Sequence, residues 1–255
     1  VAGGPYAGVE GSAVAFDATQ SSDPDEGDVL SFAWSFGDGA SGTGSMPTHT
    51  YADNGTYTVR LIVSDQFGAA DTTYTTAVIT NAAPTLLSLV TPPAAAIGTA
   101  QTVSVSWTDP GVLDTHTVTF HWGDGTSTSV AGSGGTASAT HSYGAAGFYT
   151  VQVVVTDNDG AAASGSADVP VAVYDPNGSV NGGGTFMVAA GALVLQPDAS
   201  GRANIAFNAR STRGRLTGNL EMHLNSADFR FTADALDWLV VEGERATLRG
   251  SGRLR

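Results

Sequence analysis

The chain has 255 residues, a formal net charge of −14, no cysteine and no lysine. Its carboxylates concentrate in residues 1–174, which hold 16 acidic residues against the single Arg60. Such a polyanion repels nucleic-acid phosphates and anionic lipid headgroups, so neither is expected as a partner, and cations are the natural ligands. No stretch approaches the ~20 consecutive apolar residues of a membrane-spanning helix, so no membrane span is predicted.

The predicted elements of the first part come in two copies. In the first copy we expect strands over residues 13–17, 30–36 and 57–63. The last is a β-branched run bounded by Gly and Asp, which predicts a central strand. A Gly-Asp-Gly turn at residues 37–39 and the string Thr-His-Thr-Tyr at 48–51 lie between them. The same order of strands and turns recurs up to residue 157. The repeat predicts two all-β modules, over residues 1–82 and 83–174.

The repeated strings resemble the polycystic-kidney-disease (PKD) repeat, through WSFGDG…THTYADNGTYTVRLIVSD in the first copy and FHWGDG…THSYGAAGFYTVQVVVTD in the second. The resemblance implies two tandem immunoglobulin-like β-sandwiches in a bacterial protein located outside the cell or at its surface. Tyr57 and Tyr149 have the position of a tyrosine corner. Val59 and Val151 stand where antibody domains have the second cysteine, so the cores must hold without a disulfide.

Aspartates cluster in two loops of each copy. One loop joins the second and third strands of the sandwich and the other follows the central strand, and in the immunoglobulin topology both emerge at the same end. Converging carboxylates repel unless a cation lies between them, and Ca²⁺ tolerates irregular oxygen ligands better than Mg²⁺. We therefore predict Ca²⁺ in at least one copy, with the first as the better candidate. The predicted ligands are Asp23, Asp25, Asp28 and Asp65 in the first copy and Asp109, Asp114, Asp157 and Asp159 in the second.

Solvated turns are the alternative interpretation of these aspartates, since Asp side chains close local turns without a metal. The first loop is not an EF-hand, because twelve residues counted from Asp23 end on Trp34. Asp38 and Asp124, each between two glycines, are interpreted as turn residues at the opposite end of the sandwich. The histidines beside the repeated tyrosines are expected to have a shared packing or hydrogen-bonding role.

The chain changes character after residue 174. Residues 175–184 have the composition of a flexible linker or of the irregular entry to a new domain, and we predict a linker. Residues 185–255 alternate apolar and polar positions, which predicts an antiparallel β domain. The runs GRANIAFNAR, TGNLEMHLN and DFRFTADALDWLVVEGERATLRGSG resemble a small β-rich domain of unassigned activity that follows such repeats in exported bacterial proteins. There the chain runs past the Gly-x-Gly, so we expect either a truncated domain with an unpaired strand edge or a processing boundary at Arg255.

No nucleophile elbow, zinc motif, phosphate loop or dinucleotide fingerprint is present, so the chain is predicted not to be an enzyme. The leading hypothesis is a non-catalytic spacer or adhesion segment of a bacterial secreted or cell-surface protein, joined to further domains and stiffened by Ca²⁺. Two alternatives stay open. One is an accessory region of a secreted hydrolase that binds a surface glycan or protein ligand. The other is a filament subunit that self-associates by strand exchange through the C-terminal domain.

Overall fold

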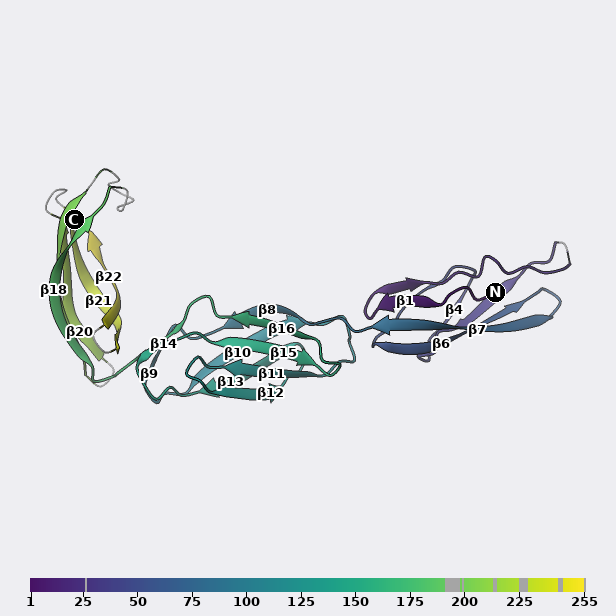
Figure 1. Cartoon of the computed structure of the whole chain (residues 1–255), viewed down its shortest axis with the longest axis horizontal. Coiled ribbons are helices and arrows are strands. Elements are labelled where there is room, and N and C mark those ends of the chain that lie inside the picture. The colour runs from purple at the N-terminus through teal and green to yellow at the C-terminus, as the bar shows by residue number, and fades with distance from the viewer. Residues whose placement is uncertain are drawn as a thin grey trace.

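The computed structural model describes residues 1–25, 27–190, 198, 200–212, 215–224, 229–242 and 245–254. Every regular element in these ranges is a β-strand, and none of them holds a helix that could cross a membrane. Three bodies follow one another along the molecule, and the C-terminal sheet stands across the line of the other two (Figure 1). The predicted all-β fold of two tandem immunoglobulin-like sandwiches and a C-terminal antiparallel domain is confirmed.

The first sandwich packs a five-stranded sheet of order β1-β7-β6-β3-β4 against the pair β2-β5. Alternate residues of β6 point inward, so Val59 and Leu61 are fully buried. They join Phe16, Trp34 and Phe36 in a core without a disulfide. The strands are β1 (Tyr6–Val9), β2 (Ala13–Ala15), β3 (Ser31–Ser35), β4 (Ser41–Thr43), β5 (Thr48–Thr50), β6 (Gly55–Ser64) and β7 (Ala70–Thr80).

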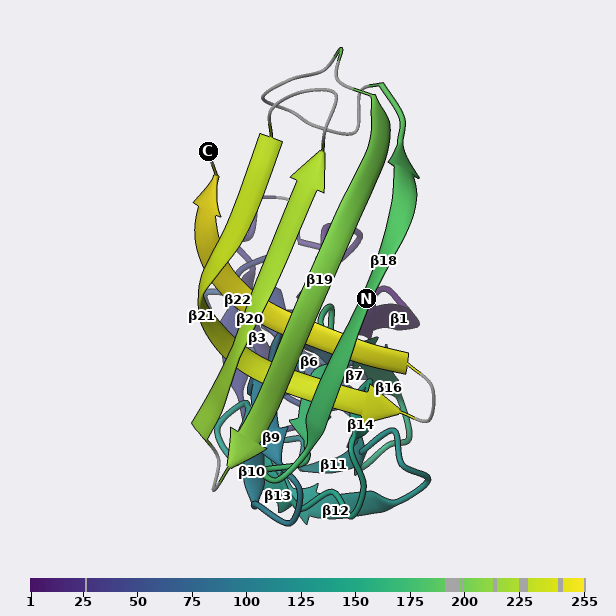
Figure 2. The ribbon, with the colours of Figure 1, turned by 90° about the vertical axis from the view of Figure 1, so that its left-hand side faces the viewer.

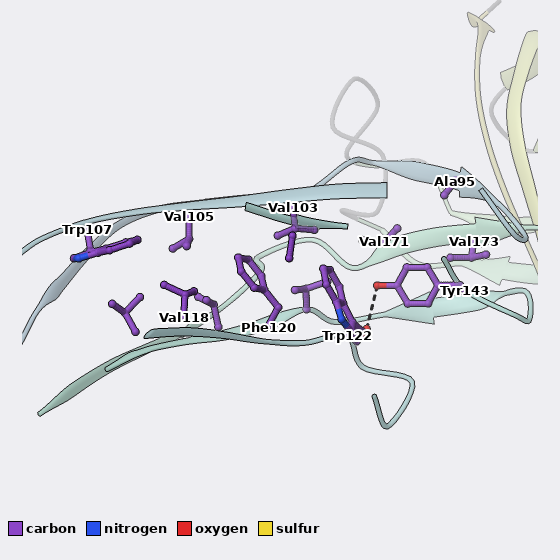
Figure 3. Packing of buried hydrophobic residues seen from close by; sticks show 14 residues of the cluster. Ala95, Val103, Val105, Trp107, Val118, Phe120, Trp122, Tyr143, Val171 and Val173 are labelled. Carbon is purple, nitrogen blue, oxygen red and sulfur yellow. Dashed lines mark hydrogen bonds between the residues drawn. The ribbon is translucent and has the colours of Figure 1, made fainter. Parts of the chain in front are cut away.

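The second sandwich has three sheets, of order β12-β11-β15-β16, β13-β10-β8 and β14-β17-β9. Figure 3 shows the valines of β10 pointing across the core at Val118 and Phe120 of β11, with Trp122 and Tyr143 closing one end. The strands are β8 (Thr85–Val90), β9 (Ala94–Ala96), β10 (Gln101–Thr108), β11 (His116–His121), β12 (Ser127–Ala131), β13 (Thr136–His141), β14 (Gly147–Tyr149), β15 (Gln152–Asp157), β16 (Ala162–Ser166) and β17 (Val171–Tyr174).

The tyrosine corner is present in both sandwiches, as predicted. The hydroxyl of Tyr57 donates to the carbonyl oxygen of Asp53 at 2.9 Å. The hydroxyl of Tyr149 donates to the equivalent carbonyl oxygen, that of Ala145, at 3.1 Å. Each bond ties the start of the central strand to the loop before it, so residues 53 and 145 occupy equivalent, fixed positions.

The Gly-Asp-Gly turns are locked by the repeated histidines. In the second sandwich the Asp124 carboxylate accepts from the Thr126 amide at 3.0 Å, and its other oxygen lies 2.6 Å from His141 Nε2. The His141 ring stacks on Trp122 with centroids 4.8 Å apart. Asp38 and His49 repeat the arrangement, also at 2.6 Å. The interpretation of both aspartates as turn residues, and of both histidines as hydrogen-bonding groups, is confirmed.

Asp124→Ala is expected to destabilise the second sandwich by about 1–2 kcal/mol, because the turn loses charge-assisted hydrogen bonds. Burial raises the pKa of Asp124, but the bonds from Thr126 and His141 outweigh it, and the pKa lies below its usual value of 3.8. The stabilisation is therefore present above pH 3.8 and is lost as the pH falls through the lower pKa of the folded state. Calorimetric unfolding from pH 7 to pH 3 measures this, and equal melting temperatures of Asp124→Ala and wild type at pH 7 would contradict it.

The C-terminal domain is one antiparallel sheet of order β18-β19-β20-β21-β22. Val188, Ala203, Leu224 and Phe229 form its buried cluster. Figure 2 shows β21 and β22 crossing the direction of β18, β19 and β20 steeply, and β21 contacts β14 and β17 of the second sandwich. The strands are β18 (Ser179–Val188), β19 (Gly201–Thr212), β20 (Arg215–Leu224), β21 (Phe229–Glu242) and β22 (Arg245–Leu254).

The predicted linker over residues 175–184 needs a correction over its second half. Residues 179–184 lie in β18, where Gly182 pairs with Phe207 of β19. A Cβ at Gly182 would lie 2.8 Å from the Phe207 ring. The glycine therefore makes room for a ring on the neighbouring strand, and composition alone cannot separate that role from flexibility.

Candidate cation site between the two sandwiches

The acidic loops of the second sandwich lie at the end that faces the first sandwich. Gly11 of the first sandwich has a φ of +70°, and a Cβ there would lie 2.6 Å from the Pro110 carbonyl oxygen, so the two backbones approach closely. The amide of Leu113 donates to the carbonyl oxygen of Ala52 at 3.4 Å. These contacts place the loop that begins at Asp109 directly against the first sandwich.

Five carboxylates gather at this contact, and both sandwiches supply them. One group consists of Glu10, Asp109 and Asp114, and the other of Asp53, Asp114 and Asp159. Within each group one oxygen from every side chain lies within 4.8 Å of the others. Because Asp114 belongs to both groups, they form one cluster, which we call the junction cluster.

Two members of the junction cluster hold buried oxygens without a partner among the described residues. Glu10 is 0% exposed; its Oε1 accepts from the Ala82 amide at 2.7 Å, and its Oε2 accepts no hydrogen bond there. Both carboxylate oxygens of Asp114 are buried and equally unpaired. A buried carboxylate in this state is strongly disfavoured unless a cation or donor faces it.

The electrostatics of Asp114 reflect the same crowding. Burial, followed by the negative charges of Glu10, Asp109 and two further aspartates, raises the pKa of Asp114 to about 6. Gly111 allows the crowding, because a Cβ there would clash with Asp114 Oδ2 and lie 2.8 Å from Glu10 Oε1. The lack of a side chain at Gly111 thus leaves space between carboxylates from the two sandwiches. Oxygen ligands in an irregular loop setting suit Ca²⁺.

The other predicted ligands of the second copy have local partners. Asp109 accepts from the Gly111 amide at 2.9 Å and lies 2.8 Å from His116 Nε2. Asp157 is 5% exposed and outside both groups. Its Oδ1 accepts from the amides of Asp159 and Ala161 at 3.0 and 2.9 Å, and its Oδ2 accepts from the Asn81 side chain at 3.0 Å. Asp157 therefore stabilises the turn that follows it. It also binds Asn81, which lies in the segment between the two sandwiches.

The first copy gathers its aspartates at the outer end of the molecule. Asp23, Asp25 and Asp28 approach within 4.8 Å of one another, but none of them is buried. Asp28 accepts from the Gln66 side chain at 3.2 Å. Asp65 is outside the group, and its Oδ1 accepts from the amides at positions 67 and 69. The sequence favours this copy as the cation site, whereas the geometry favours the second, where burial leaves oxygens unpaired.

The sequence prediction missed Glu10 and Asp53, which belong to the first sandwich. A signal for them exists in the repeat itself. The amides of Gly11 and Gly98 donate to the carbonyls of the equivalent Tyr51 and Tyr143, both at 2.9 Å, so the residue before each glycine is equivalent. The second sandwich has Ile97 where the first has Glu10, and Ala145 where the first has Asp53. At these two pairs of equivalent positions, the carboxylates thus belong to the sandwich whose end meets another acidic surface.

Comparison with known proteins places these features in a family. Collagenase ColA of Bacillus cereus is 45% identical over 67 residues, which cover 26% of this chain and 7% of the collagenase. The pre-pro-metalloprotease PrtV of Vibrio cholerae is 44% identical over 64 residues, or 25% of this chain and 7% of that protein. The chain thus spans only a small part of these relatives. Among solved structures, the amphioxus IgVJ-C2 molecule aligns with 64% of this chain and 98% of its own, at 16% identity and a TM-score of 0.39.

A family model described as the PKD domain matches residues 1–80 and matches again over residues 81–173. Each match takes in one sandwich with its Gly-Asp-Gly turn, its histidine and its tyrosine corner. Because the two matches together cover more than half of the chain, the protein belongs to the PKD-domain family.

Proposed function

We propose that this chain is a non-catalytic spacer of a bacterial secreted protein, and that Ca²⁺ bound at the acidic end of the second sandwich stiffens it. The relatives point to a protease as the host, with these domains as its accessory segment outside the cell. The end-to-end arrangement of the three bodies suits a spacer, because it sets neighbouring domains far apart (Figure 1).

One observation carries the cation part of the proposal: the oxygens of Asp114 are buried and have no hydrogen-bond partner in the described part of the chain. A bound cation would satisfy both oxygens and remove the repulsion that raises the pKa of this carboxyl. Extracellular modules bind Ca²⁺ with dissociation constants of about 10⁻⁴–10⁻³ M. A site of this strength is filled outside a cell and empty in a chelator.

Thermal unfolding in EDTA and in millimolar Ca²⁺, with Mg²⁺ as the control, tests the proposal. Millimolar Ca²⁺ is about one to ten times such a dissociation constant, so an ion that binds only the folded state adds about 0.4–1.4 kcal/mol to the free energy of unfolding. We expect a rise of several degrees in the melting temperature of the second sandwich with Ca²⁺ and a smaller rise with Mg²⁺. An unchanged melting temperature in Ca²⁺ would rule out the cation and leave a plain spacer.

A carbohydrate-binding accessory role has less support. Exposed aromatic rings are the usual platform for sugars, yet Trp34, Trp107 and Trp122 are at most 3% exposed. The remaining tryptophan, Trp238, packs edge-on against Phe148 of the second sandwich with ring centroids 5.8 Å apart. Three tryptophans therefore pack in the cores of the sandwiches, and Trp238 packs at the contact between the second sandwich and the C-terminal domain.

A further inference from the structure

We propose that the Ca²⁺ ligands at the junction come from both sandwiches, with Glu10 and Asp53 of the first completing the site, so that Ca²⁺ locks the first sandwich against the second. This inference rests on the proposed binding of Ca²⁺ at the acidic loops. It adds the ligands that the first sandwich contributes and a consequence for the shape of the molecule.

The first sandwich holds the Glu10 side chain and the Asp53 backbone in place before any ion arrives. The Glu10 amide donates to the Thr80 carbonyl at 3.1 Å, and Glu10 Oε1 accepts from the Ala82 amide. These bonds leave Oε2 as the unpaired oxygen, on a side chain that is completely buried in an acidic cluster. The backbone of Asp53 is fixed by the Tyr57 hydroxyl. The Glu10 side chain is therefore preorganised and Asp53 starts from a fixed backbone, which reduces the entropy cost of coordination.

Apart from the backbone contact of Gly11 with Pro110, few other contacts join the two sandwiches in the described part of the chain. Their buried residues form two separate hydrophobic clusters, so no common apolar core spans the junction. The direct polar contacts among the described residues include the weak Leu113 to Ala52 bond and the bond from Asn81 to Asp157. Five carboxylates face one another across these contacts. Without a cation the repulsion among these carboxylates opposes the closed junction. A bound cation attracts carboxylates of both sandwiches and so stabilises the closed junction.

The next junction provides an internal comparison. At the equivalent end of the second sandwich, Ile97 and Ala145 replace the two carboxylates. There the contact to the C-terminal domain includes the aromatic pair of Phe148 and Trp238. An apolar contact does not depend on a cation. Ca²⁺ is therefore expected to change the geometry between the first two bodies and to leave that between the last two unchanged.

Distance measurements between spin labels on the full chain test this. The chain has no cysteine, so Thr72→Cys with Ser164→Cys labels only the first junction, and Ser164→Cys with Ser251→Cys labels only the second. All three positions are exposed. We expect the first pair to give a broad distribution in EDTA and a narrow one in millimolar Ca²⁺. The second pair should give the same distribution in both.

Ligand variants separate the inference from the proposed function. Glu10→Gln and Asp53→Asn are each expected to weaken Ca²⁺ binding at least tenfold in calorimetric titration and to keep the first distribution broad. Asp25→Asn, in the outer acidic loop, is the matched control and should behave as wild type. Glu10→Gln loses a buried charge, so in EDTA it should melt no lower than wild type, which shows that it folds.

Each outcome decides one of the two claims. If wild type binds Ca²⁺ but both first-sandwich variants bind it with unchanged affinity, the second sandwich holds the ion alone and the shared site is wrong. A first distribution that stays broad in Ca²⁺ would equally overturn the lock. If wild type binds no Ca²⁺ in the titration, the cation part of the proposed function fails together with the shared site.

Discussion

Trp122→Ala is expected to destabilise the second sandwich by about 3–5 kcal/mol, the range for removing a large aromatic side chain from a core. The side chain is 1% exposed and lies between the rings of Phe120 and His141, with centroids 5.6 and 4.8 Å away. Its indole nitrogen donates to Thr128 Oγ1 at 3.0 Å. Alanine removes the ring contacts and the hydrogen bond together. Differential scanning calorimetry should show one transition at a much lower temperature.

Trp122→Phe is the matched control, because phenylalanine is what the first sandwich has at the equivalent position, Phe36. There the ring stacks on His49 with centroids 4.2 Å apart. We expect this variant to keep most of the stacking and to lose about 1 kcal/mol with the hydrogen bond to Thr128. Equal melting temperatures for the alanine and phenylalanine variants would show that ring packing at this site contributes little.

Gly123→Ala is expected to cost about 3 kcal/mol or more, whereas Gly125→Ala two residues later should cost about 1 kcal/mol. Both glycines have positive φ, at +85° and +89°. A Cβ at Gly123 would lie 2.7 Å from the carbonyl oxygen of Thr150, while a Cβ at Gly125 meets nothing within 4 Å. The backbone strain is shared, so the difference isolates the steric clash.

Urea unfolding of the two glycine variants side by side measures this difference. The first sandwich offers a replicate, since a Cβ at Gly37 would lie 2.6 Å from the Thr58 carbonyl oxygen and one at Gly39 is unobstructed. The clash interpretation is wrong if Gly123→Ala and Gly125→Ala unfold at the same urea concentration.

The fold is predictable where the decisive contacts are local and repeated. Tyr57 and Asp124 bond to groups a few residues away or to a histidine in the next repeated string, so one sequence window contains both partners. Gly182 shows the limit of this reasoning. Its role depends on Phe207 across the sheet, which no sequence window around it contains.

The junction cluster is only half predictable for the same reason. Asp109, Asp114 and Asp159 stand in loops whose convergence follows from the topology of one sandwich. Asp157 of the second sandwich and Asp65 at the equivalent position of the first are also predicted as ligands, but nearby amides donate to one oxygen of each. Glu10 and Asp53 reach the site only because one sandwich is stacked on the next. That stacking depends on how two bodies dock, and hydrophobic periodicity within either body carries no information about it.

Because Glu10 and Ile97 stand at equivalent positions, duplication of the first sandwich and duplication of the second would create different junctions. The first sandwich carries acidic loops at its outer end and Glu10 with Asp53 at its inner end. A gene duplication of that sandwich would therefore create a new junction with carboxylates on both sides. A duplicate of the second sandwich would instead set Ile97 and Ala145 against aspartates. Of the two sandwiches, the first is thus the one whose duplication would repeat a junction with carboxylates on both sides.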